Sequence, residues 1–195
     1  MSRIAILVGR HGRGSNMVAL IRACAEGRVQ AKVECVLTPS LTSPAVEFAE
    51  REGVQVIAFD PKAPDGGETL SSLLSERKID VLCLAGYMSL LPESAIETMK
   101  GRVLNIHPAL LPKFGGKGMY GHHVHEAVLA AGETESGCTV HWVTREYDEG
   151  AIVLQKTCAV LPDDTAETLG ERVLRLEHQA YAEAVQLVLS GGVTP

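Results

Sequence analysis

The sequence is poor in aromatic residues and has no excess of basic charge. Only 4% of its 195 residues are aromatic, and 18 Lys and Arg are outnumbered by 24 Asp and Glu, which gives a formal net charge of −6. Because a nucleic-acid binder normally carries a basic face, we expect no nucleic-acid partner. No apolar run approaches the roughly 20 residues of a membrane-spanning helix, and no signal-peptide cleavage pattern follows Met1. We therefore expect no membrane partner.

Cysteine is present but shows no pairing pattern. The five cysteines are odd in number and widely spaced, and none forms a C-x-x-C pair. This spacing predicts neither a disulfide framework nor a zinc site, so we expect a reducing, cytoplasmic location. The cysteines are Cys24, Cys35, Cys83, Cys138 and Cys158.

Short apolar runs alternate with helical segments over the first hundred residues. This alternation, with short connections, predicts an α/β protein with a mostly parallel sheet. Continuous apolar runs are typical of strands that are buried on both faces. The predicted strands span residues 4–8, 33–37, 54–58, 81–85 and 103–106. The predicted helices span residues 16–26, 44–53, 70–77 and 92–99, with Pro44 as the first residue of the second helix.

A different order follows residue 106. A loop rich in Gly and His runs to about residue 121, a helix follows to about residue 131, and strands are predicted at 139–143 and 152–159. In the last helix we expect Asp164 as N-cap, with Glu167 completing a capping box. One apolar stripe follows, at Leu169, Val173, Leu176, Ala180, Ala184 and Leu187. Because no repeat or linker interrupts this order, the chain is predicted to be a single domain.

The loop after the first strand reads Gly9-Arg10-His11-Gly12-Arg13-Gly14-Ser15-Asn16. Glycines allow backbone N–H groups to approach an anion closely, and the following helix N-terminus adds a favourable dipole. The glycine spacing matches neither a Walker P-loop nor G-x-G-x-x-G. Ligands of open parallel sheets bind beyond the carboxyl ends of the strands, which slightly favours phosphate binding here. The alternative is a tight turn in which Ser15 or Asn16 caps the helix.

Asn105 and His107 lie near the end of the fifth predicted strand and face the same side of it, whereas Ile106 faces the other layer. Two polar residues on one face of a buried strand are costly unless they are hydrogen-bonded or functional. An imidazole can move a proton near neutral pH, and an amide can stabilise an oxyanion. A hydrogen-bonded core pair is the alternative, but the position at the carboxyl end favours a catalytic role.

Other polar positions are left open by the local pattern. Asp148, in the acidic turn 145–150, can orient a histidine or accept a proton, although a plain turn residue is the commoner case. Glu177 is either a rim charge or an acceptor for ligand hydroxyls. The histidines at the end of the Gly- and His-rich loop lack acidic or Cys partners at ligand spacing, so no metal is predicted. One of them can still line a cleft. They are His122, His123 and His125.

Seven motifs occur in order along nearly the whole chain: GRGSN at 12–16, LAGYM at 84–88, NIHPALLP at 105–112, GCTVHWV at 137–143, DEG at 148–150, IVLQ at 152–155 and EH at 177–178. In this combination they resemble the glycinamide ribonucleotide formyltransferases, part of the folate-dependent formyltransferase superfamily. The run N-I-H-P-x-L-L-P with a downstream D-x-G is specific to the superfamily. The first loop and the last helix narrow the resemblance to this family.

The resemblance implies the formyltransferase fold, a single-domain Rossmann-like open sheet with helices on both faces. It also implies transfer of a formyl group from 10-formyltetrahydrofolate to the primary amine of glycinamide ribonucleotide, in purine biosynthesis and without a metal. Residues 1–100 would form the nucleotide- and phosphate-binding half, and residues 101–195 the catalytic and folate-binding half. The substrates are small molecules, and the oligomeric state, monomer or homodimer, is left open.

The resemblance also assigns roles to individual residues. Asn105 and a protonated His107 would stabilise an oxyanion, and Asp148 would favour the charged imidazole, so these three form the catalytic trio. The substrate phosphate and ribose would be held by Gly14, Ser15, Asn16 and Glu177. The folate pocket would be formed by Tyr87, Met88, Ser89, Leu90, Leu91, Thr144, Arg145, Glu146 and Tyr147.

Alternative functions are another folate-dependent formyltransferase, a formyltetrahydrofolate hydrolase, or a non-catalytic nucleotide-binding module. The complete trio disfavours the module, because a pure binder has no need for all three residues. The chain ends soon after Glu177, so we expect no appended domain. Two segments depart from the family pattern: the Gly- and His-rich loop 113–123, and the first loop, which carries His11 and Arg13.

Overall fold

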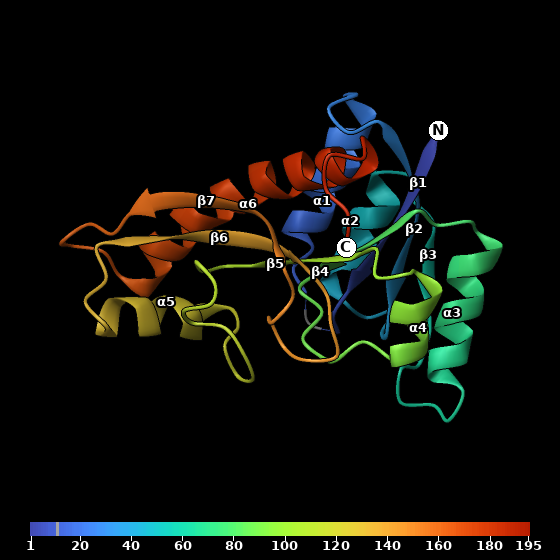
Figure 1. Cartoon of the computed structure of the whole chain (residues 1–195), viewed down its shortest axis with the longest axis horizontal. Helices are drawn as coiled ribbons and strands as arrows, with labels where there is room; N and C mark the ends of the chain where they lie inside the picture. Colours follow the sequence, from blue (N-terminus) through green and yellow to red (C-terminus); the bar gives the residue numbers. More distant parts are fainter. Residues whose placement is uncertain (11) are drawn as a thin grey trace.

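One seven-stranded sheet runs through the part of the chain that the structure, a computed structural model, describes: residues 1–10 and 12–195. His11, whose role the sequence leaves open, lies outside the described residues. The sheet order is β3-β2-β1-β4-β5-β6-β7 (Figure 1). The strands are β1 (Ser2–Val8), β2 (Ala31–Thr38), β3 (Val56–Ala58), β4 (Val81–Ala85), β5 (Val103–His107), β6 (Glu135–Trp142) and β7 (Ile152–Ala159).

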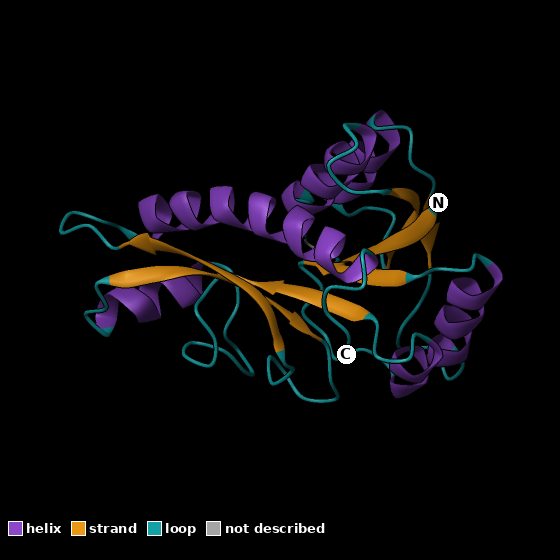
Figure 2. Cartoon of the chain, turned by 45° about the horizontal axis from the view of Figure 1, so that its top comes forward, coloured by secondary structure: helices purple, strands orange, loops and turns teal. Residues whose placement is uncertain are grey.

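Strands β1 to β5 pair in parallel, whereas β6 and β7 are antiparallel to their neighbours. Helices pack on both faces of this sheet (Figures 1 and 2). The described helices are α1 (Ser15–Ala25), α2 (Pro44–Arg51), α3 (Gly66–Glu76), α4 (Glu93–Thr98), α5 (His122–Ala130) and α6 (Ala166–Leu189). The predicted single-domain α/β fold, with an open and mostly parallel sheet, is therefore confirmed.

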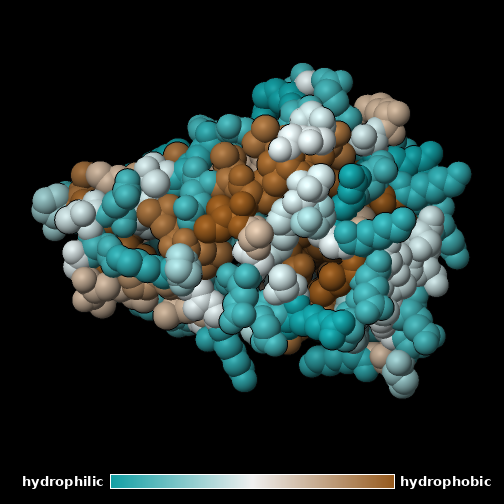
Figure 3. Space-filling model, viewed as in Figure 1, coloured by the Kyte–Doolittle hydropathy of each residue, from teal (hydrophilic) through white to brown (hydrophobic). Residues whose placement is uncertain are grey.

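Two apolar clusters cover the two faces of the sheet. Helices α1, α2 and α6 contribute to the larger cluster, and α3 and α4 contribute to the smaller one on the opposite face. Strands β1 and β4 are buried along most or all of their length because they lie inside the sheet with helices on both sides. The edge strand β7 is only half-buried, and in Figure 3 apolar side chains reach the surface near β6, β7 and α6.

The start of α6 differs from the prediction. Thr165 rather than Asp164 is the N-cap, and it forms the capping box with Thr168 rather than Glu167. Asp164 is unavailable as a cap because its carboxylate accepts two hydrogen bonds from Arg172, at 2.6 and 2.8 Å, and one from the Thr168 hydroxyl. The capping signal was therefore correct in kind but displaced by one residue.

Two other elements begin earlier than predicted, and in both the first residues include glycine, which is not typical of a helix or a strand. Helix α3 begins at Gly66 and strand β6 at Glu135, each four residues before the predicted position. Gly137 lies within β6, where a Cβ would stand 2.0 Å from the Lys156 carbonyl oxygen of β7. The residue is a glycine because the two strands approach closely there, and it reads as a strand breaker in the sequence.

None of the helices in residues 1–10 and 12–195 combines the length and the apolar character needed to cross a membrane. The five cysteines are free thiols. The cytoplasmic location stays a prediction.

Tyr181 joins α6 to the centre of the sheet. Its side chain is fully buried, and its hydroxyl lies 2.8 Å from the Leu84 carbonyl oxygen and 3.1 Å from that of Leu104. These carbonyls belong to the neighbouring strands β4 and β5. The hydroxyl therefore fixes α6 against both strands immediately before they reach the carboxyl edge of the sheet.

We predict that Tyr181→Phe lowers the free energy of unfolding by about 1–3 kcal/mol, because it leaves buried carbonyls without this donor. Urea denaturation measures the change, and the m-value should not change. Tyr120→Phe is the control, since the Tyr120 side chain is exposed. Equal unfolding midpoints for wild type and Tyr181→Phe would contradict this role.

Candidate active site

A cavity lined by many polar side chains lies where the strand order reverses. Strand β1 has β2 on one side and β4 on the other, so the loops after β1 and β4 diverge at their carboxyl ends. Open α/β sheets bind ligands at such a point. Near it the two loops almost touch, because a Cβ on Gly9 would stand 2.3 Å from the Gly86 carbonyl oxygen. The cavity has a volume of about 930 Å³ and is lined from both halves of the chain.

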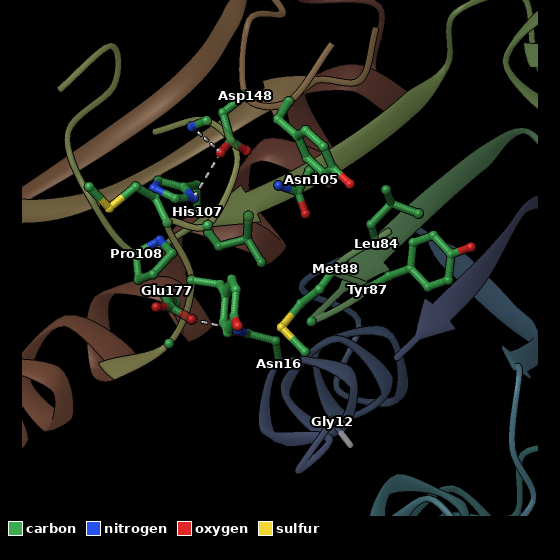
Figure 4. Close-up of a pocket in the computed structure, with 18 of the residues that line it drawn as sticks. Gly12, Asn16, Leu84, Tyr87, Met88, Asn105, His107, Pro108, Asp148 and Glu177 are labelled. Carbon is green, nitrogen blue, oxygen red and sulfur yellow. Dashed lines mark hydrogen bonds and ion pairs between the residues drawn. The ribbon is translucent and has the colours of Figure 1, made fainter. Parts of the chain in front are cut away.

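His107 lies at the end of β5, and its ring orientation is fixed by a backbone carbonyl. Its Nε2 is 2.8 Å from the Phe114 carbonyl oxygen, which can only accept a hydrogen bond. The neutral ring therefore carries its proton on Nε2 and leaves a lone pair on Nδ1. Nδ1 lies 3.5 Å from Asp148 Oδ2 (Figure 4). The nitrogen that can accept a proton thus faces a carboxylate.

Asp148 is a largely buried carboxylate that lies beside a backbone N–H and two imidazole rings. The Gly116 backbone N–H donates to its Oδ2 at 2.9 Å, and His141 Nε2 lies 3.4 Å from its Oδ1. Burial alone raises the pKa of Asp148, but His141, His107 and the Gly116 N–H together hold that pKa below its usual value. The backbone has a φ of 58°, in the left-handed region that Asp tolerates better than most residues. Asp148 is therefore ionised and is no plain turn residue.

Two opposing effects set the pKa of His107 in the free protein. Burial lowers the pKa of His107 below its usual value, and this effect outweighs Asp148 and the Phe114 carbonyl, which both raise it. The charge of His141 lowers the pKa further. Asp148 acts in the predicted direction, but it does not compensate for the burial, so the ring is poised to accept a proton rather than already charged.

Strands β6 and β7 hold the loop that follows β5. The Thr139 hydroxyl accepts from the Leu111 N–H at 3.0 Å and donates to the Ala109 carbonyl at 2.7 Å. Gln155 Nε2 donates to both the Leu111 carbonyl and Thr139 Oγ1. These contacts fix the path of the loop, and so they determine where the Phe114 carbonyl meets His107.

Asn105 pairs with His141 across the antiparallel β5–β6 ladder. Asn105 Nδ2 lies 3.1 Å from His141 Nε2, and His141 Nδ1 lies 2.8 Å from the Trp142 carbonyl oxygen. His141 is buried and lines the cavity. Asn105, His141, Asp148 and His107 therefore form one connected group at one end of the cavity, with Asp148 between the two histidines.

The first loop and α1 form the other end of the cavity (Figure 4). Ser15 and Asn16 line it, as does Arg13, but Gly14 does not. Gly14 is instead the N-cap of α1, with a φ of 79° and no side-chain cap, so neither Ser15 nor Asn16 caps the helix. The first N–H groups of α1 then lack a side-chain acceptor among the described residues, which suits an anion.

Glu177 of α6 is buried beside this loop. Asn16 Nδ2 donates to Glu177 Oε2 at 2.5 Å. Burial raises the pKa of Glu177, although the hydrogen bond from Asn16 lowers it. Glu177 is therefore no rim charge but an acceptor held inside the cavity.

The segments predicted to hold folate line the same cavity as this connected group. All of the residues predicted for this role line the cavity except Arg145, which turns away to pair with Glu93 and Glu97. The Tyr87 hydroxyl is buried and has no hydrogen-bond partner among the described residues. The residues of this role that line the cavity are Tyr87, Met88, Ser89, Leu90, Leu91, Thr144, Glu146 and Tyr147.

Of the three histidines in α5, His122 and His125 line the cavity and His123 does not. His125 is buried against Gly170 of α6, and burial lowers its pKa. In the described part of the chain no cluster of three or more His, Cys, Asp or Glu side chains is arranged to hold a metal ion. A metal-free reaction stays a prediction.

Sequence reasoning missed His141 and Thr139 as residues of this site, and it left open the role of Arg13, which lines the cavity. The first two carried a detectable signal, because they alternate along β6 as Asn105 and His107 alternate along β5. Residues from both predicted halves, 1–100 and 101–195, line this one cavity. The division into a nucleotide half and a catalytic half stays a prediction.

Comparisons with known proteins agree with this arrangement. A family model described as formyl transferase matches residues 2–185. A chloroplastic phosphoribosylglycinamide formyltransferase of Arabidopsis thaliana is 41% identical over 189 residues, which cover 94% of this chain and 64% of that protein. The chain therefore spans slightly less than two thirds of this relative.

Two solved structures are similar over nearly the whole length. A glycinamide ribonucleotide transformylase 1 from Symbiobacterium toebii has a TM-score of 0.90 and 36% identity, covering 100% of this chain and 91% of that one. A phosphoribosylglycinamide formyltransferase from Brucella melitensis has a TM-score of 0.87 and 40% identity, covering 99% and 98%.

The lowered pKa values of His107 and His125 predict acid sensitivity. Below pH 6.5, the usual histidine pKa, the unfolded chain binds protons that the folded protein excludes, so stability falls until the pH reaches the folded-state values. Each such histidine contributes at most about 1.4 kcal/mol per pH unit. We expect the unfolding free energy to drop between pH 7.5 and 5.5, and to drop less in His125→Gln.

Urea titrations at the two pH values measure this difference, which does not depend on the absolute stability of the variant. His123→Gln, which replaces an exposed histidine of the same helix, should show the wild-type drop. An identical drop in His125→Gln and wild type would contradict the assignment.

Proposed function

This chain belongs to the formyl transferase family, and from this premise we propose that it transfers a formyl group from 10-formyltetrahydrofolate to the primary amine of glycinamide ribonucleotide. One observation carries the proposal. A single cavity holds Asn105, His107 and Asp148 at one end, and an open helix N-terminus beside a buried carboxylate at the other. A phosphorylated amine is matched by these two ends together.

The phosphate end binds by fixed backbone dipoles. Ser15 and Asn16 present the first N–H groups of α1 to the substrate phosphate, and Arg13 adds a positive charge at the cavity wall. Glu177 accepts hydrogen bonds from the ribose hydroxyls, because its position beside Asn16 places it next to the phosphate site. Binding at this end directs the amine of the substrate toward His107.

The residues of the other segment suit a folate. Tyr87, Leu90 and Leu91 offer apolar surface, and the unpartnered Tyr87 hydroxyl offers a hydrogen bond to a polar ring. The cavity volume of about 930 Å³ is near the upper end of the roughly 300–1,000 Å³ that is usual for small-molecule sites. When bound, 10-formyltetrahydrofolate supplies the formyl group as an activated amide.

His107 and Asp148 handle the proton of the reaction. As the amine nitrogen bonds to the formyl carbon, Nδ1 of neutral His107 accepts the amine proton, directly or through a water. Asp148 then stabilises the imidazolium at 3.5 Å. The same proton passes to the folate nitrogen as its bond to the formyl carbon breaks, so no net proton is consumed.

Asn105 acts on the oxygen of the formyl group. The oxygen gains negative charge when the carbon becomes tetrahedral, and an amide N–H that is already in position stabilises it without reorganisation. The charged form of His107 adds to this stabilisation. A formyltetrahydrofolate hydrolase is the runner-up function, but water as acceptor gives no purpose to a phosphate and ribose site at Asn16 and Glu177.

We expect the protein to release tetrahydrofolate cofactor and formylated product when it is mixed with 10-formyltetrahydrofolate and glycinamide ribonucleotide. Absorbance follows the folate, and mass spectrometry identifies the product. Ribose 5-phosphate, which lacks the amine, is the control and should give no release. Release of tetrahydrofolate without glycinamide ribonucleotide, with water as the formyl acceptor, would indicate the hydrolase. Binding of both compounds without turnover would indicate a non-catalytic module.

Removal of either proton-handling side chain should slow the reaction. We expect His107→Ala and Asp148→Ala to lower kcat by about 10²-fold or more, as is usual for lost acid–base groups. His123→Ala and Asp163→Ala are matched controls at exposed positions outside the cavity and should keep wild-type rates. Near-normal turnover in both site variants would exclude the assigned roles.

A further inference from the structure

Arg145 is the one residue predicted for the folate role that does not line the cavity, although its two chain neighbours do. Its guanidinium instead forms an ion pair with Glu93, and its Nη2 lies 3.7 Å from Glu97 Oε1. Both carboxylates belong to α4, which begins shortly after the segment 87–91. The ion pairs of Arg145 therefore join the two segments that form the proposed folate pocket, one of which follows β4 and the other β6 (Figure 1).

The segment 144–147 has few other polar contacts. The Thr144 hydroxyl donates to the Glu146 carbonyl oxygen and accepts from the Glu146 N–H, both at 3.3 Å, and these contacts stay within the segment. Among the hydrogen bonds and ion pairs of residues 1–10 and 12–195, only those of Arg145 join the segment to another element. Arg145 is therefore the one polar tether of this segment in the described structure.

Both ends of this segment are held by contacts that do not involve Arg145. Before it, the Val143 N–H donates to the Val103 carbonyl oxygen of β5 at 2.9 Å, and the Val143 side chain packs against the apolar cluster to which α3 and α4 contribute. After it, Asp148 accepts a hydrogen bond from the Gly116 N–H at 2.9 Å. The position of the middle of the segment, where side chains line the cavity, thus depends on Arg145, whereas the positions of its ends do not.

The two partners of Arg145 on α4 repel each other. Glu93 and Glu97 are four residues apart, so they lie on one side of the helix, and like charges at this spacing are destabilising. The guanidinium offsets this repulsion because it meets both carboxylates. The side chains of Arg145, Glu93 and Glu97 are 66%, 50% and 67% exposed, so solvent screens the ion pairs and they contribute little to stability. Their effect is on where the segment 144–147 lies.

We propose that Arg145 is a positioning residue, whose ion pairs with α4 hold the segment 144–147 beside 87–91 and thereby set the width of the folate pocket. This inference rests on the proposed function, because the folate role of both segments belongs to it. Arg145 does not contact the folate in this role and acts through its chain neighbours, which line the cavity.

Initial-rate kinetics of two variants test this role. We expect Arg145→Ala to raise the KM for 10-formyltetrahydrofolate about two- to fivefold, the effect of one exposed ion pair. Arg145→Glu should raise it more, about five- to twentyfold, because a third carboxylate then repels the two on α4. In both variants kcat and the KM for glycinamide ribonucleotide should change less than about twofold, since Asp148 and the phosphate end keep their own contacts.

Charge exchange and salt separate positioning from a merely structural role. Adding Glu93→Lys to Arg145→Glu restores an ion pair with its charges exchanged, so the KM for the folate should return to within about threefold of wild type. Raising the ionic strength from about 0.01 M to about 1 M shortens the screening length from roughly 30 Å to 3 Å, so the difference in KM between wild type and Arg145→Glu should largely vanish. A KM that neither responds to Glu93→Lys nor converges at high salt would overturn the inference.

Arg51→Glu is the matched control, because Arg51 is 66% exposed like Arg145 and pairs with Glu47 on α2, outside the cavity, so both KM values should stay unchanged. Failure of the inference and failure of the proposed function are distinguishable. Absence of formyl transfer by the wild-type protein would overturn the proposed function. Normal transfer by the wild type, together with a wild-type KM for the folate in Arg145→Glu or an equal change in kcat and both KM values, would overturn only the positioning role.

Discussion

The buried carboxylate of Asp148 is the constraint on which the rest of the site depends. An ionised carboxylate inside a protein is stable only when donors surround it. Here the Gly116 N–H in the loop after β5 donates to it, and two imidazoles lie beside it, His107 of β5 at 3.5 Å and His141 of β6 at 3.4 Å. Each partner has a fixed position only because the others do. The carboxylate therefore joins segments that lie far apart in the sequence, and the geometry that stabilises it also places a proton acceptor and an amide at one cavity.

The antiparallel pairing of β6 with β5 brings the side chains of this group together. Strands β1 to β5 are parallel, so their carboxyl ends lie at one edge of the sheet, and β5 brings Asn105 and His107 to the cavity there. Because β6 returns antiparallel beside β5, its side chains lie opposite those of β5, and Thr139 pairs with His107 as His141 pairs with Asn105. Thr139 fixes the loop after β5, and this fixes the Phe114 carbonyl that selects the His107 tautomer. Fold and chemistry thus meet in one strand pair.

Much of the fold and half of the site could be predicted from local pattern, and the remainder depends on contacts across the sheet. The alternation of polar residues identified Asn105 and His107 without any knowledge of the fold. The same alternation on β6 went unused, because its meaning depends on which strand pairs with β5. Asp148 looks like an ordinary turn residue, and only a resemblance to known proteins singled it out. The lowered pKa of His107 could not be predicted, since burial and Asp148 oppose each other and their balance depends on depth. The shift of the N-cap to Thr165 has a similar cause, because the Asp164 carboxylate is already bound by Arg172, eight residues further along the chain.

The two ends of the cavity solve opposite electrostatic problems with different means. In the proposed function, the phosphate end must hold a permanent anion, for which the dipole of α1 and the nearby Arg13 need no proton transfer. The end with Asn105, His107 and Asp148 would, in the same proposal, hold a charge that exists only briefly, and its imidazole groups can gain and lose protons. Glu177 lies beside the phosphate end, and because burial raises its pKa, it carries less negative charge at a given pH than an exposed glutamate. A net charge of −6 on the whole chain is compatible with anionic substrates because the positive potential is local, built from backbone and imidazole groups rather than from an excess of Lys and Arg.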